Sequence, residues 1–202
     1  MKTIKEEKIE TIEVKKSKFI AFCFRVSHEE EIKEKIEKIR KEHKTARHVV
    51  YAYKLNNIEK YDDDKEPNKT AGFPMLEIIN YRELSNVLIV VVRYFGGIKL
   101  GAGGLTRAYA QAATNVLDSC DEIKLTVGYE VSVEGHIKDY NTINHLLITK
   151  NIKILKKEIS DHFKIIIEIK KDNLEQIVNE IKGKNHKIKI EIVKERMVVD
   201  DK

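Results

Sequence analysis

Apolar residues recur along this chain with the spacing of strands in some stretches and of helices in others. The run from Val87 to Val92 is apolar throughout, which is typical of a strand that is buried on both faces. A loop with five glycines follows it, and the apolar residues beyond the loop have helical spacing. The chain is therefore predicted to be organised around a strand, a glycine-rich loop and an amphipathic helix. The apolar positions of that helix are Leu105, Ala108, Tyr109, Ala112, Ala113, Val116 and Leu117.

Two further strands and a helix are predicted before this central stretch. Residues 20–26 and 48–55 alternate as strands, and Ile32, Ile36 and Ile39 mark the buried stripe of a helix between them. Residues 56–72 are mostly polar and are predicted to form one long loop. Loops of this length in compact domains are usually functional or disordered.

The second half of the chain has a different order of elements. From Val127 onward the pattern predicts strand, helix, two strands, helix and strand, which is the βαββαβ order of ferredoxin-like domains. The stretch from Asp118 to Lys124 is polar and lacks core periodicity. We therefore predict an α+β protein with two domains, residues 1–123 and residues 124–202.

Composition favours a soluble cytoplasmic protein. Of the 202 residues, 42% are hydrophobic and 35% charged, which allows packed cores beneath a well-solvated surface. No apolar run approaches the roughly 20 residues that a membrane span requires, and no secretory signal is visible at the start. The two cysteines give no metal-ligand spacing. No cofactor and no metal are predicted, and the sequence does not indicate an oligomeric state.

The glycine-rich loop is the best candidate for a binding site. A loop between a strand and a helix aims free N–H groups of the helix at an anion, and glycines let the ligand approach the backbone. Cations near a helix N-terminus are unfavourable by roughly 0.3–1 kcal/mol unless an anion is present, and Arg107 is expected in the first turn. A tight turn with solvated cations is the alternative. The predicted anion-binding residues are Arg93, Gly96, Gly97, Lys99, Gly101, Gly103, Gly104 and Arg107.

The acidic loop is a second candidate. The candidate acid–base groups or ligands are His48, Asp63, Asp64 and Glu66. Carboxylates in a long loop are not a positioned pair, so no catalytic residue can be assigned. Lys65 interrupts the acidic cluster, which favours an exposed loop over a cation site. The net charge of +5 is too small to establish nucleic-acid binding by itself.

The sequence from Arg93 to Ala112, RYFGGIKLGAGGLTRAYAQA, resembles the signature of the IMPACT/YigZ family. The resemblance extends over residues 63–76, where the family has D-D-G-E-P followed by T-A-G-x-P-M-L. Lys65 replaces the glycine of that motif, and Asn68 and Lys69 stand where the family has Ser-Gly. The resemblance implies a first domain folded like the second domain of ribosomal protein five of the small subunit. It also implies a ferredoxin-like second domain similar to the last domain of elongation factor G.

The same resemblance implies a role around translation. Eukaryotic IMPACT proteins restrain the amino-acid-starvation kinase by competing for its activator. The leading hypothesis is a non-enzymatic cytoplasmic regulator that binds RNA, a ribosome or a translation factor through the glycine-rich loop. One alternative is an enzyme or small-ligand protein that binds a phosphorylated metabolite at the same loop. A protein-interaction module without an anion site is the third. Tyr94 and Phe95 could stack on bases, although core positions are favoured for them.

Overall fold

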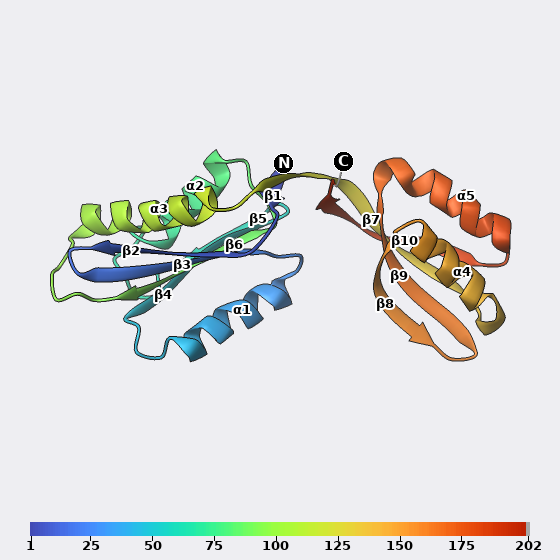
Figure 1. Cartoon of the computed structure of the whole chain (residues 1–202), viewed down its shortest axis with the longest axis horizontal. Coiled ribbons are helices and arrows are strands. Elements are labelled where there is room, and N and C mark those ends of the chain that lie inside the picture. The colour runs from blue at the N-terminus through green and yellow to red at the C-terminus, as the bar shows by residue number, and fades with distance from the viewer. Residues whose placement is uncertain (201–202) are drawn as a thin grey trace. The chain divides into compact units, whose positions relative to one another are not determined.

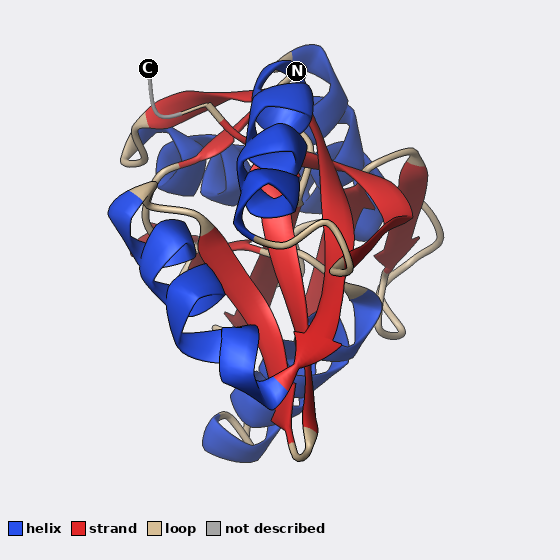
Figure 2. Ribbon diagram, turned by 90° about the vertical axis from the view of Figure 1, so that its right-hand side faces the viewer, coloured by secondary structure: helices blue, strands red, loops and turns tan. Residues whose placement is uncertain are grey.

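The computed structural model describes residues 1–200, which divide into two compact units, residues 1–124 and residues 125–200. Each unit combines helices with a sheet of antiparallel strands (Figures 1 and 2), which confirms the predicted α+β class. That each unit folds by itself stays a prediction, which limited proteolysis can test. None of the helices in residues 1–200 is both long enough and apolar enough to cross a membrane.

The first unit is built on a five-stranded sheet in the order β2-β3-β6-β4-β5. Every neighbouring pair in this sheet is antiparallel. The central position of β6 means that it is hydrogen-bonded on both edges. The strands are β2 (Lys8–Val14), β3 (Ser17–Arg25), β4 (His48–Leu55), β5 (Ile58–Asp62) and β6 (Val87–Tyr94).

Helices cover both faces of this sheet (Figure 1), so β6 is buried on both sides. On one face Val87, Ile89 and Val91 pack in the same cluster as residues of α2 (Gly72–Tyr81) and α3 (Ala102–Asp118). On the other face Leu88, Val90 and Val92 pack with residues of α1 (Glu29–Glu42). Successive side chains of a strand point to opposite faces, and both faces here are apolar. The uninterrupted apolar run in the sequence is the consequence.

The predicted loop over residues 56–72 is wrong in its first part, because β5 occupies Ile58–Asp62. This strand lies at the edge of the sheet, and four of its five residues are exposed. An edge strand with little burial needs no apolar alternation, and its sequence therefore resembles a loop. The connection from β5 to α2 is the shorter segment of residues 63–71.

The polar segment from Asp118 to Lys124 is structured rather than a free linker. Asp118 ends α3, and Cys120 is buried in the core of the first unit. Residues 122–124 are the first part of β7 (Glu122–His136), and they pair with β1 (Lys2–Ile4). This pairing holds the end of the first unit in place.

The second unit has the ferredoxin-like order of elements. The strand order is β10-β7-β9-β8, all antiparallel, and the apolar side chains of β7 and β9 form a core with those of two helices. Its further elements are α4 (Ile137–Thr149), β8 (Lys153–Ile159), β9 (His162–Lys170), a 3₁₀ turn η1 (Lys171–Asn173), α5 (Leu174–Lys184) and β10 (Lys189–Val199).

Candidate functional site

A cavity of about 390 Å³ lies in the first unit where the two predicted candidate regions meet. It is bounded by the start of β4, the end of β6, the acidic loop, the glycine-rich loop and the start of α3. The size is within the range of small-ligand sites. The lining residues are Arg47, His48, Glu66, Pro67, Arg93, Phe95, Lys99, Leu100, Gly101, Ala102 and Leu105.

Strand pairing brings the polar groups of the cavity together. In the register of β4 and β6, His48 lies directly opposite Arg93. The antiparallel pairing of β4 with β5 returns the chain toward the start of β4, so the acidic loop begins beside His48. Glu66 in that loop then reaches Arg93. Three residues from distant parts of the sequence therefore share one wall of the cavity.

The glycine-rich loop is shaped by three of its glycines. Gly97 and Gly101 have φ angles of 84° and 69°, which favour glycine. At Gly96 a Cβ atom would lie 2.0 Å from the carbonyl carbon of Lys16, so the loop passes against the turn between β2 and β3. The Gly96 N–H donates to Ser17 Oγ at 3.1 Å. The loop is thereby tied to the neighbouring strands before it turns into α3.

The start of α3 presents free backbone N–H groups. Gly101 is the N-cap residue, and no side chain in residues 1–200 caps the helix there. The Leu105 N–H donates to the Gly101 carbonyl at 2.9 Å, so the preceding amides of Ala102, Gly103 and Gly104 come before the first intrahelical bond. Gly101 and Ala102 line the cavity. These amides carry the positive end of the helix dipole.

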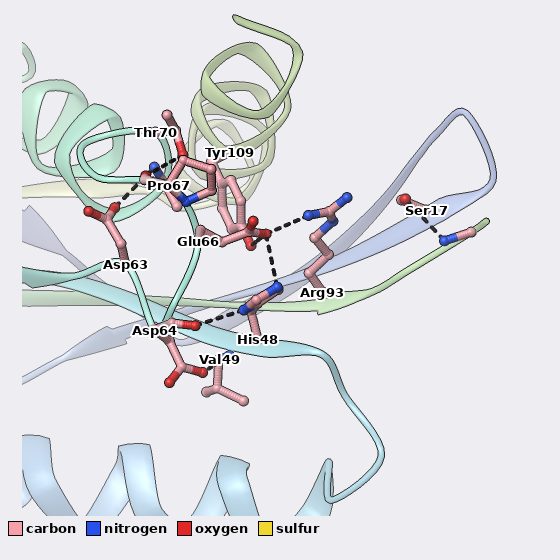
Figure 3. A network of polar contacts seen from close by, with 12 residues as sticks. Ser17, His48, Val49, Asp63, Asp64, Glu66, Pro67, Thr70, Arg93 and Tyr109 are labelled. Carbon is pink, nitrogen blue, oxygen red and sulfur yellow. Dashed lines mark hydrogen bonds and ion pairs between the residues drawn. The ribbon is translucent and has the colours of Figure 1, made fainter. Parts of the chain in front are cut away.

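Glu66 is the centre of a buried polar network beside the cavity (Figure 3). Its Oε1 atom accepts hydrogen bonds from Arg93 Nη1 at 2.6 Å and from the Tyr109 hydroxyl at 2.9 Å. His48 Nε2 lies 3.6 Å from the same oxygen. Burial, together with the charge of Glu66, raises the pKa of Tyr109 well above its usual range, so this hydroxyl stays protonated and donates. The carboxylate is thus held in one position.

The ring of His48 is held in one orientation. Its Nδ1 atom lies 2.7 Å from the backbone carbonyl oxygen of Asp64, and a carbonyl can only accept, so Nδ1 carries the proton. In the neutral ring Nε2 is then the acceptor. His48 lines the cavity and its Nε2 lies beside Glu66, so Nε2 rather than Nδ1 is the ring nitrogen that a ligand can reach.

The two aspartates of the acidic loop have a different position from Glu66. Asp63 Oδ1 accepts from the Ala71 and Gly72 N–H groups, and Asp63 Oδ2 accepts from Lys69 N–H. Asp63 therefore holds the start of α2. Asp64 Oδ2 accepts from Val49 N–H at 2.6 Å and pairs with Arg40. Neither aspartate lines the cavity, whereas His48 and Glu66 do.

Arg107 lies outside the cavity. The helix begins at Ala102, so Arg107 is its sixth residue and lies in the second turn, exposed. The expectation of a first-turn position is therefore wrong. Gly103 and Gly104 also belong to the helix rather than to the loop, and neither has a positive φ. Of the cations in the predicted anion-binding set, Arg93 and Lys99 line the cavity.

Three important residues of the site were not assigned their roles from the sequence. Arg47 lines the cavity and precedes β4, where no pattern distinguishes it from other exposed basic residues. The core position of Tyr109 is predicted correctly from the sequence, but its hydroxyl partner lies 43 positions away in sequence. Phe95 was favoured for the core, yet half of its surface is exposed and its ring lines the cavity. Tyr94 is only partly buried, and its hydroxyl lies 2.8 Å from His43 Nδ1.

The acidic loop keeps a backbone shape suited to glycine at two lysines. Lys65 and Lys69 have φ angles of 68° and 60°, in the left-handed region. These are the positions where the family motif has glycine. The two lysines therefore hold backbone angles that glycine adopts without strain, and Glu66 in the same loop contacts Arg93.

Comparison with known proteins identifies the family. The Impact N-terminal domain pattern matches residues 15–117, which contain every residue of the cavity lining. The IMPACT family member YvyE of Bacillus subtilis is 48% identical over 119 residues, which make up 57% of this chain and 55% of the relative. This chain is thus matched to little more than half of that relative's length.

Two further matches cover more of the chain. The IMPACT family member YigZ of Escherichia coli is 32% identical over 151 residues, covering 72% of this chain and 74% of the relative. A solved structure described as that of a hypothetical protein is 25% identical with a TM-score of 0.75, over 96% of this chain and 97% of the other. Together, the domain match and these relatives show that the chain belongs to the IMPACT family.

Proposed function

We propose that this protein is a cytoplasmic, translation-associated regulator that binds RNA, free or within the ribosome, at the mouth of the cavity. The observation that carries the proposal is the combination found there. Exposed Arg47 and Lys99, the start of α3 with its free amides and the half-exposed ring of Phe95 all line one cavity. Membership of the IMPACT family supports a role around translation.

The chemistry of this opening suits a single RNA strand. Arg47, Lys99 and the α3 amides would take phosphate oxygens, which position a strand without reading its sequence. An exposed aromatic ring beside such cations can stack on an unpaired base. Phe95 is also within 5.8 Å of the Arg93 guanidinium, which keeps the ring at the edge of the cavity. The expected binding is therefore directed to single strands and largely independent of sequence.

Replacing Lys99 with Glu tests this proposal. We expect the affinity for a single-stranded RNA to fall by about tenfold or more, because a charge-assisted phosphate contact is lost and a repulsion is added. The slope of log K against log salt should flatten by about one unit. The measurement is fluorescence anisotropy over a range of salt concentrations.

Lys124→Glu is the matched control. Lys124 is exposed, undergoes the same change of charge and does not line the cavity. It should lower the affinity much less than Lys99→Glu. Equal losses from both reversals would mean that only net charge matters. Failure of the unmodified protein to bind RNA would refute the proposed function altogether.

A further inference from the structure

The cavity has two chemically different ends. Its exposed part has the cations Arg47 and Lys99, and Gly101 and Ala102 at the start of α3 also line the cavity. Its buried end carries His48 and Glu66, whose side chains are only 11% and 4% exposed. One end therefore attracts an anion, whereas the other offers hydrogen-bond acceptors.

The acceptors at the buried end are available to a ligand. Three groups crowd around Glu66 Oε1, but no residue within 1–200 makes a hydrogen bond to Glu66 Oε2. In the neutral ring of His48, Nε2 is an acceptor because Nδ1 donates to the Asp64 carbonyl. An unpaired carboxylate oxygen requires a donor, and a hydroxyl group is a neutral one. An internal water could serve, yet the cavity has room for much more.

Charge at the other end indicates the kind of anion. The charged groups of the lining are three cations, Arg47, Arg93 and Lys99, and one carboxylate, Glu66. The three cations exceed the one carboxylate by two positive charges. A phosphomonoester carries about −1.5 to −2 at neutral pH and matches this excess. An internal phosphodiester carries a single negative charge and leaves about half of the excess unmatched.

A buried, unpaired donor gives independent support for a ligand. Arg93 is 95% buried and lines the cavity, and its Nε atom has no hydrogen-bond partner in the described part of the chain. Leaving a buried charged donor unpaired is costly, so such groups commonly mark a missing partner. A ligand oxygen that reaches Nε would supply one.

We propose that the cavity binds a phosphomonoester attached to a hydroxyl-bearing sugar, as found at the phosphorylated end of an RNA or in a free nucleoside monophosphate. The phosphate lies against the α3 amides, Lys99 and Arg47. A sugar hydroxyl donates to Glu66 Oε2 or His48 Nε2. If the ligand is an RNA, this inference rests on the proposed function. It narrows the bound segment from any part of the RNA to its phosphorylated end.

Changes in the ligand test this inference without altering the protein. Binding is measured for a hexaribonucleotide with a 5′-phosphate, the same RNA with a 5′-hydroxyl, the 5′-phosphorylated DNA of the same sequence, and a nucleoside 5′-monophosphate. Removing the phosphate should weaken RNA binding by about tenfold or more. Replacing RNA by DNA should weaken it by about threefold or more, since the 2′-hydroxyl is lost.

The four ligands separate this inference from the proposed function. Equal binding of the two RNAs would overturn the inference while RNA binding itself stands. Binding of the nucleoside monophosphate without binding of RNA would support the phosphomonoester site and refute the proposed function. Binding of none of the ligands would overturn both.

Two variants then test the role of the buried acceptors. With Glu66→Gln, the preference for RNA over DNA should fall by about threefold, whereas the preference for the 5′-phosphate should remain. If the only effect of Glu66 were to repel phosphate, removing its charge would instead strengthen the binding of RNA and DNA equally. Thermal unfolding establishes that the variant is folded. If it is not, His48→Phe removes the other acceptor. An unchanged preference for RNA in the folded variant would overturn the hydroxyl contact.

Discussion

Replacing Arg93 with Met is expected to lower the free energy of unfolding of the first unit by about 3–5 kcal/mol. The Arg93 and Glu66 side chains are only 6% and 4% exposed, and their charged atoms are 2.6 Å apart. Removing the cation leaves a buried carboxylate whose charge is no longer matched. Tyr109 still donates to it, but a neutral hydroxyl does not replace a guanidinium. Urea unfolding followed by circular dichroism, fitted with a transition for each unit, measures the effect.

Two comparisons show whether the buried ion pair is the cause. Arg107→Met removes an exposed arginine of the same unit and should change the stability by less than about 0.5 kcal/mol. Adding Glu66→Leu to Arg93→Met should recover much of the loss, because a buried pair that is removed as a whole is far less costly than a broken one. A loss from Arg93→Met as small as that from Arg107→Met would show that the pair is not buried in solution.

Gly96→Ala is expected to destabilise the protein by about 3 kcal/mol, at the upper end of the usual cost of overpacking. The added Cβ would lie 2.0 Å from the carbonyl carbon and 2.1 Å from the carbonyl oxygen of Lys16. These are backbone atoms, so a change of rotamer cannot relieve the contact. The turn between β2 and β3 would have to move away from the glycine-rich loop. Thermal and urea unfolding measure the loss.

Gly103→Ala is the matched comparison and should have the opposite sign. At Gly103 the nearest atom to an added Cβ is Arg107 Nη1, at 3.7 Å, and the residue is helical. Alanine is favoured over glycine in a helix by about 0.5–1 kcal/mol, so this variant should be slightly more stable. If both alanines had the same effect, the close approach at Gly96 would be contradicted.

Much of the fold could be predicted from the sequence where burial imposes a pattern. Strand β6 is buried on both faces and appears as an unbroken apolar run, and the predicted limits of β4 are those observed, His48–Leu55. The edge strands β2 and β5 have few buried positions, and neither was predicted. Local sequence cannot reveal a strand whose stability comes from pairing with a neighbour.

The candidate site could be predicted only in separate parts. The glycine-rich loop and the acidic loop stand as two separate candidates in the sequence, because nothing local joins Glu66 to Arg93. Their contact depends on the register that places His48 opposite Arg93, and register is a long-range property of the sheet. The position of Arg107 was wrong for a smaller reason, since it depended on which residue begins α3.

The most direct test of the account is an NMR titration of the unmodified protein with 5′-phosphorylated single-stranded RNA. We predict that the largest changes in backbone amide chemical shift occur at Ala102, Gly103 and Gly104, whose N–H groups begin α3 without a capping side chain among residues 1–200. Lys99 and Phe95 should follow, because both line the same cavity. Shifts spread over the basic residues of both units, with the three α3 amides unchanged, would contradict phosphate binding at this site.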